Sequence, residues 1–241
     1  MSTPTSSFGT QKQTSHLMNL FTGIFVTVLV LVASTASKFI AIGPFNISGA
    51  TIIFPITYFF NDILTEVYGY QRSRQIIWTG LACQVLAAAT YWLVGVWPPA
   101  PFWHNQEAYE TILSSAPRIT LASLTAYFCG EFANSVVLSK LKSLQSGKRG
   151  LRQAARFVGS TVVGEAIDSV VFMSVGFLGV LPTKNVVATI VTIYAFKVLF
   201  EIVALPFTVS ASNWVKRVEG IDVIDRPNVT NYNPFRFWAR D

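Results

Sequence analysis

Charged residues are scarce in this chain. Only 12 % of its 241 residues are Asp, Glu, Lys or Arg, whereas soluble domains carry about 25 %. Cysteine and histidine are scarcer still, with two of each (Cys83, Cys129, His16 and His104). So few ligands exclude a disulfide framework and argue against a zinc cluster. The composition that remains is 51 % hydrophobic, which predicts an integral membrane protein and not an ordinary soluble enzyme.

Long apolar segments recur along the chain, each long enough for the roughly 20 residues that a helix needs to cross a bilayer core. They predict six transmembrane helices, and hence an all-α integral membrane protein. The predicted spans are residues 17–37, 48–68, 76–97, 119–141, 157–181 and 186–211. The second region is the least regular, because Gly43, Pro44, Gly49 and Pro55 interrupt it.

Lysine and arginine are distributed unevenly between the two sides that these spans define. Fourteen of the 18 lie on the side that holds both termini, three lie on the other side, and Lys197 lies inside a span. The positive-inside rule therefore predicts cytoplasmic tails at residues 1–16 and 212–241, with a transmembrane domain at 17–211 between them. The net charge of +6 then reports topology and attraction to lipid headgroups. No nucleic-acid-binding motif accompanies it, so we expect no nucleic-acid partner.

Half of the acidic residues fall inside predicted spans, where a charge costs about 2.5–3.5 kcal/mol on insertion scales. They are Asp62, Glu66, Glu131, Glu165, Asp168 and Glu201. Helical spacing places other polar side chains on the same faces: Tyr58 and Asn61 with Asp62, Tyr127 and Asn134 with Glu131, and Tyr194 and Lys197 with Glu201. Such acids should line a polar cavity, pair with one another, or be protonated.

Two of these acidic segments are copies of each other. Residues 130–137 and 164–171 share the pattern G-E-x-x-[N/D]-S-V-V, 34 residues apart. Because consecutive spans cross the membrane in opposite directions, the repeat indicates inverted symmetry of the kind that surrounds many transporter substrate sites. The alternative is convergence, since small residues favour helix packing in membranes.

Structural roles are open for the other acids. Lys197 and Glu201 could form an internal ion pair that makes a charge tolerable in lipid. Asp62 and Glu66 could anchor the cytoplasmic end of their helix, with Arg72 or Arg74 as partners.

Residues 54–69, which read FPITYFFNDILTEVYG, resemble the signature F-P-[IL]-[ST]-x-x-x-x-D-x-[IL]-[ST]-E-V-Y-G of the bacterial queuosine precursor transporters, also called the vitamin uptake transporter family. The tail EGIDVIDR at 219–226, followed by Asn233-Pro234-Phe235, is similar to that family's ending. The resemblance implies import of 7-deazaguanine bases across the inner membrane. It also implies a six-helix fold similar to the substrate-binding components of energy-coupling-factor transporters, and a homodimer.

A guanine-like edge presents adjacent N–H groups that carboxylates accept, and its flat ring suits aromatic stacking. We therefore expect a substrate pocket at midplane depth, with Asp62 and Glu66 lining it or gating its cytoplasmic side. The candidate residues are Tyr58, Asn61, Asp62, Glu66, Tyr127, Glu131, Asn134, Glu165, Asp168, Tyr194, Lys197 and Glu201.

No catalytic residue, metal site or cofactor is predicted. The chain lacks a Walker A loop, so proton coupling and facilitated diffusion are both open as transport modes. The main competing interpretation is a substrate-binding subunit that needs a separate energising module. An intramembrane enzyme or a channel is less favoured, because no span contains His and no ring of pore-lining charges is evident.

Overall fold

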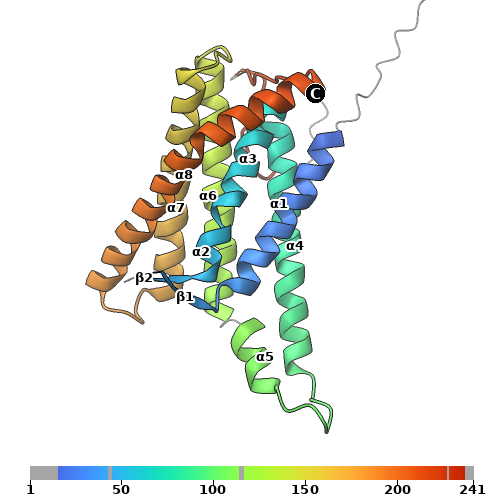
Figure 1. Ribbon diagram of the computed structural model, residues 1–241, viewed down its shortest axis with the longest axis vertical. Coiled ribbons are helices and arrows are strands. Elements are labelled where there is room, and N and C mark those ends of the chain that lie inside the picture. The colour runs from blue at the N-terminus through green and yellow to red at the C-terminus, as the bar shows by residue number, and fades with distance from the viewer. Residues whose placement is uncertain (1–15, 43–44, 114–116, 227, 237–241) are drawn as a thin grey trace, which may run out of the picture.

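The computed structural model describes residues 16–42, 45–113, 117–226 and 228–236. Long helices dominate it, and they run roughly along one axis (Figure 1). In chain order the elements are α1 (His16–Thr35), β1 (Phe39–Ile42), β2 (Phe45–Ser48), α2 (Gly49–Ile53), α3 (Pro55–Tyr68), α4 (Tyr70–Val96), α5 (Gln106–Leu113), α6 (Pro117–Leu144), α7 (Leu151–Phe177) and α8 (Thr183–Glu219).

Five helices are long and apolar enough to cross a membrane: α1, α4, the segment that contains α6, α7, and α8. The predicted all-α membrane fold is therefore confirmed. The second predicted span is divided into α2 and α3. α2 ends at Ile53 with Phe54 as its C-cap, and Pro55, which has no backbone N–H to donate, begins α3. α3 has 14 residues, or about 21 Å at 1.5 Å per residue, which is shorter than the hydrocarbon core.

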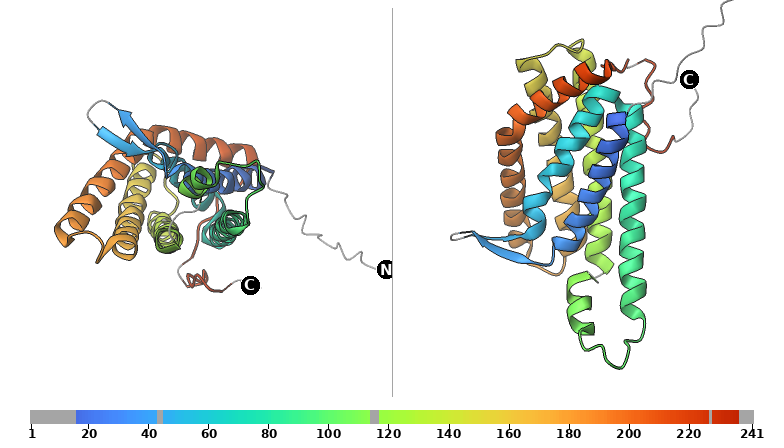
Figure 2. Two further views of the ribbon diagram at one scale, coloured as in Figure 1. Left: turned by 90° about the horizontal axis from the view of Figure 1, so that it is seen from below. Right: turned by 45° about the vertical axis from the view of Figure 1, so that its right-hand side comes forward.

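The short strands β1 and β2 were not predicted. β1 and β2 pair antiparallel, with Phe39 opposite Ser48 and Ile42 opposite Phe45, and the hairpin projects from the side of the bundle in both views of Figure 2. At the opposite end of α3, Gly69 has a φ of +80°, which a residue with a side chain rarely adopts. This glycine lets α4 begin at Tyr70, directly after α3 ends.

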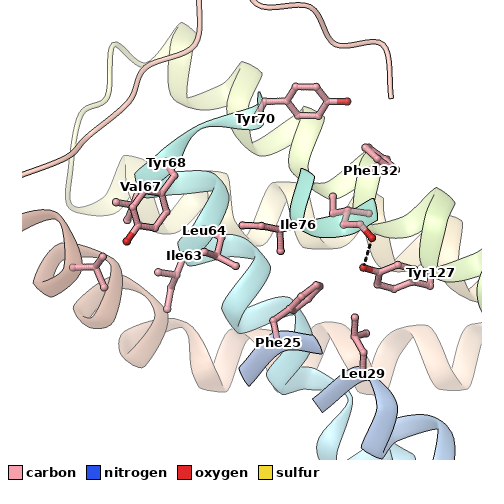
Figure 3. Close-up of a cluster of buried hydrophobic side chains, with 12 residues drawn as sticks. Phe25, Leu29, Ile63, Leu64, Val67, Tyr68, Tyr70, Ile76, Tyr127 and Phe132 are labelled. Atoms are coloured by element: carbon pink, nitrogen blue, oxygen red, sulfur yellow. Dashed lines mark hydrogen bonds between the residues drawn. The ribbon is translucent and has the colours of Figure 1, made fainter. Parts of the chain in front are cut away.

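The apolar core lies between α1, α3, α4, α6 and α8. Figure 3 shows Phe25 and Leu29 of α1 facing Ile63 and Leu64 of α3, with Tyr127 of α6 beside them. The Tyr127 hydroxyl donates to the Ile77 carbonyl over 3.0 Å. This core fixes one side of α3 and α6, and the polar residues on their other sides are thereby held toward α7 and α8.

The helix ends next to the α6–α7 connection are rich in Lys and Arg, and the segment after α8 folds back over them (Figure 1). Val223 donates its backbone N–H to the Val67 carbonyl at 3.0 Å, and the Trp78 indole donates to the Pro234 carbonyl at 2.8 Å. Arg74 donates to the carbonyls of Asn231 and Asn233. We call this end of the bundle the basic end.

Candidate substrate-binding site

Four helices bring five carboxylates together inside the bundle. α3 supplies Asp62, α6 supplies Glu131, α7 supplies Glu165 and Asp168, and α8 supplies Glu201. None of the five is more than 7 % exposed. We call these residues, with Tyr58, Asn61, Asn134 and Lys197, the acidic cluster.

The Tyr58 hydroxyl lies among the carboxylates of the cluster without a hydrogen bond to any of them. It lies within electrostatic range of Glu165, Asp168, Glu131 and Asp62, which come from three different helices. Glu201 interacts in the same way with Asp62. Residues that the sequence places on separate spans therefore share one site.

Asn61 is held on both sides of its amide. Its Nδ2 donates to Glu131 Oε2 at 2.5 Å and to Ser135 Oγ at 3.1 Å. Its Oδ1 accepts from Ser73 Oγ at 3.0 Å. Because both ends of the amide are engaged by the protein, Asn61 orients Glu131 and leaves little capacity for a ligand.

Lys197 is the cation of the cluster. Its Nζ lies 2.8 Å from Glu165 Oε2, is ion-paired with Asp168, and stands 3.9 Å from the centre of the Phe54 ring. The predicted alternative of a Lys197–Glu201 pair is not what the structure shows, because the lysine reaches across to α7.

The duplicated motif packs about a local two-fold arrangement. A Cβ placed on Gly130 would lie 2.8 Å from the Asp168 Cβ, and a Cβ placed on Gly164 would lie 2.8 Å from the Asn134 Cβ. The glycine of each copy therefore makes room for the N/D position of the other copy. This reciprocal packing agrees with the inverted symmetry that the repeat predicts. It holds Asn134 and Asp168 at the α6–α7 contact.

Several buried polar atoms of the cluster lack a hydrogen-bond partner among the described residues. Asn134 Nδ2 donates to Asp62 Oδ1 at 2.7 Å. No donor among the described residues forms a hydrogen bond with Asp62 Oδ2, Asn134 Oδ1 or Glu201 Oε1. The Tyr58 hydroxyl is also without a partner there. Buried polar groups are almost always hydrogen-bonded, so this group of three acceptors and one hydroxyl is equipped to bind a ligand.

Glu66 lies apart from this group, at the basic end. Arg156 donates to both of its carboxylate oxygens, and Lys216 Nζ lies 2.6 Å from its Oε1. The helix-anchoring interpretation of Glu66 therefore fits the geometry, with partners other than the Arg72 or Arg74 expected for it. Arg72 is exposed, and Arg74 binds the tail carbonyls.

Lys142 and Asp222 complete a network around Glu66. Asp222 accepts from Lys142 at 2.5 Å, lies 2.9 Å from Lys216 Nζ, and comes from the segment after α8. Burial would raise the pKa of Asp222, but the hydrogen bonds and positive charges of the two lysines hold it below its usual value. We call Glu66, Lys142, Arg156, Lys216 and Asp222 the basic-end network.

The two remaining candidates contribute less directly. Tyr127 belongs to the apolar core through its bond to Ile77, although its ring stands one helical turn from Glu131. Tyr194 is half-buried on α8, close to Lys197 in sequence. Sequence reasoning missed Phe54 as a partner of Lys197, and it missed the whole set of cations around Glu66. The acidic residues of the tail motif at 219–226 were the one available signal for the network.

Comparison with known proteins gives two matches. Residues 48–211 match the family model described as "Putative vitamin uptake transporter", a range that includes every residue of the acidic cluster. A protein of Bacillus subtilis (strain 168) named "Probable queuosine precursor transporter" is 28 % identical over 170 residues, which cover 70 % of this chain and 72 % of that protein. No solved structure matches the chain.

Proposed function

The chain belongs to the vitamin uptake transporter family, and on that premise we propose that it imports queuosine precursors, 7-deazaguanine bases such as the cyano and aminomethyl forms. The observation that carries the proposal is the set of unmatched acceptors on Asp62, Asn134 and Glu201. The name of the Bacillus subtilis relative supports the same substrate class.

The chemistry of the base complements that set. The guanine edge offers one ring N–H and an exocyclic amino group as donors, with a carbonyl oxygen beside them as acceptor. Asp62, Asn134 and Glu201 accept the donors, and the Tyr58 hydroxyl donates to the carbonyl. A hydrogen bond to a charged group contributes about 1.5–3 kcal/mol, so loss of either carboxylate should weaken binding strongly.

Transport is secondary or facilitative in this proposal, and it involves no covalent chemistry. The protein lies in the plasma membrane as a homodimer, with the basic end in the cytoplasm, as the distribution of Lys and Arg favours. Labelling of a cysteine placed at Lys148 only after permeabilisation of cells would support that orientation. Cross-linking in native membranes would report the dimer.

The direct test is uptake of the labelled cyano and aminomethyl bases by cells that express the chain and have no uptake of their own. Glu201→Gln should lower the initial rate by about tenfold or more, because it removes a charged partner of the base worth more than 1.4 kcal/mol. Glu131→Gln and Glu165→Gln should also lower it, because they remove the carboxylates that hold Asn61 and Lys197 in the cluster. Glu107→Gln is the matched control, since Glu107 is exposed on α5. Normal uptake by all three cluster variants, at wild-type protein levels, would disprove the site.

Reconstitution separates the transport modes. Purified protein in proteoliposomes should take up the base without any other component, and dependence of the rate on an imposed proton gradient would establish coupling. Binding without uptake would instead favour the alternative function, a substrate-binding subunit that needs a separate energising module.

A further inference from the structure

The ammonium group of Lys197 is enclosed on three sides. Glu165 and Asp168 of α7 supply two carboxylates, and Phe54 supplies the face of its ring at 3.9 Å, from the break between α2 and α3. Two carboxylates and an aromatic face are the groups that proteins use to bind organic ammonium ions. The enclosure therefore has the chemistry of an ammonium site.

A group next to the enclosure also lacks a partner. Tyr58 packs its ring against Phe54 with 5.6 Å between the ring centres, and its hydroxyl is buried without a hydrogen-bond partner among the described residues. The enclosure thus borders the unmatched acceptors of the acidic cluster, where we have proposed that the base binds.

Lys197 is the counter-ion of the acidic cluster. Five carboxylates of the acidic cluster face a single ammonium group among the described residues, and both ion pairs that the cluster forms there are made by Lys197. Buried carboxylates of like charge disfavour one another, and a cation between two of them relieves that repulsion. Any amine that takes the place of Lys197 would meet the same attraction.

We propose that Glu165, Asp168 and the Phe54 ring form a subsite for a primary ammonium ion, that Lys197 occupies it in the ligand-free protein, and that Lys197 thereby determines which bases are accepted. While the lysine fills the subsite, an amine-bearing base must displace a tethered cation, whereas a neutral base meets no such competitor. Lys197 is then a specificity-determining residue that favours neutral over cationic ligands. The statement about bases rests on the proposed function, but the ammonium subsite does not.

The test replaces the lysine by a free amine. Lys197→Ala removes three methylene groups and the ammonium, which is the shape of n-propylammonium. In thermal unfolding of the purified full-length variant at pH 7, where a primary amine is protonated, n-propylammonium should raise the melting temperature and 1-propanol should not. Wild-type protein and Lys184→Ala should show no such response, since the wild-type subsite is filled and Lys184 is exposed at the start of α8.

A variant that folds poorly still gives a result. If Lys197→Ala is recovered only when n-propylammonium is present during solubilisation, and not with 1-propanol, the subsite is supported. Equal behaviour with amine and alcohol, or no recovery with either, contradicts it.

The second arm measures the affinities of the aminomethyl and cyano bases for both proteins. Lys197→Ala should shift the affinity ratio by about tenfold toward the aminomethyl base, the size expected for one charge-assisted contact. An unchanged ratio would overturn the specificity role. If propylammonium binds the variant but neither base binds any protein, the subsite stands and the proposed function fails. If the bases bind but propylammonium does not, the function stands and the subsite fails.

Discussion

The acidic cluster and the basic-end network are two groups of buried charges in one bundle, and α3 contributes an acid to each. Glu66 and Asp62 are one helical turn apart, and both are 0 % exposed. Glu66 binds Arg156 with both oxygens and Lys216 with one, whereas Asp62 receives a single bond from Asn134 and has one oxygen unmatched within the described residues.

This difference separates two uses of a buried carboxylate. A carboxylate whose oxygens are all engaged by cations of the same chain joins helices, and removal of one partner leaves the others uncompensated. A carboxylate with an oxygen unmatched retains capacity for a donor from outside. Burial and charge alone do not distinguish the two, but the count of hydrogen bonds does.

The largest loss of stability should come from neutralising Glu66, at the centre of the basic-end network. Glu66→Gln leaves Arg156 buried without its counter-ion and leaves Lys216 with Asp222 alone, and breaking a buried ion pair typically destabilises a protein by about 3–5 kcal/mol. Glu201→Gln is the matched comparison, because it neutralises a carboxylate with an unmatched oxygen and should cause little or no loss. Unfolding of both variants in the same detergent measures this, and equal losses would remove the distinction between the two regions.

A smaller effect should come from the contact between the two copies of the repeated motif. Gly130→Ala puts a methyl group 2.8 Å from the Asp168 Cβ and 3.0 Å from the Tyr58 hydroxyl, and overpacking of this kind costs about 1–3 kcal/mol. Because both neighbours belong to the acidic cluster, the affinity for the base should also fall.

Gly159→Ala on α7 is the control, since its nearest neighbour would be Leu141 Cδ1 at 3.4 Å, an ordinary contact distance. Equal stability and equal affinity of the two alanine variants would show that close α6–α7 packing does not shape the site.

The smallest effect concerns the pH dependence of the basic-end network. The pKa of Asp222 is lowered in the folded protein, so its ionised form contributes stability above the unfolded pKa of about 3.9, and that contribution is lost as the pH falls through the lower folded value. Asp222→Asn should therefore destabilise the protein at pH 7 by about 1 kcal/mol, a modest value because the carboxyl is partly exposed and screened.

The difference between wild type and Asp222→Asn should shrink as the pH is lowered below about 4. A difference that stays constant from pH 7 to acid would mean that the charge of Asp222 contributes nothing.

Much of this architecture could be predicted from the sequence, for identifiable reasons. Apolar runs of span length and the bias of Lys and Arg are properties of single segments, so they predicted the membrane helices without knowledge of packing. The repeated motif predicted the α6–α7 relation, because each copy carries both the glycine and the polar residue that the other copy contacts.

Partnerships between distant segments could not be predicted in this way. Helical spacing pairs Lys197 with Glu201, but the lysine extends to α7 because Glu165 and Asp168 offer two carboxylates and Phe54 adds its ring. Glu66 was grouped with the substrate site because it shares a face of α3 with Asp62. Only the fold shows that Arg156 and Lys216, 90 and 150 residues away, engage it.

Ligand binding to variants of the unmatched acceptors tests the central claim most directly. Titration calorimetry of the cyano base with purified wild-type, Asp62→Asn and Glu201→Gln proteins should show at least about a tenfold loss of affinity for each variant, while both unfold no more readily than the wild type. Unchanged affinity in both variants would contradict the account, and so would an affinity loss that only follows a loss of folded protein.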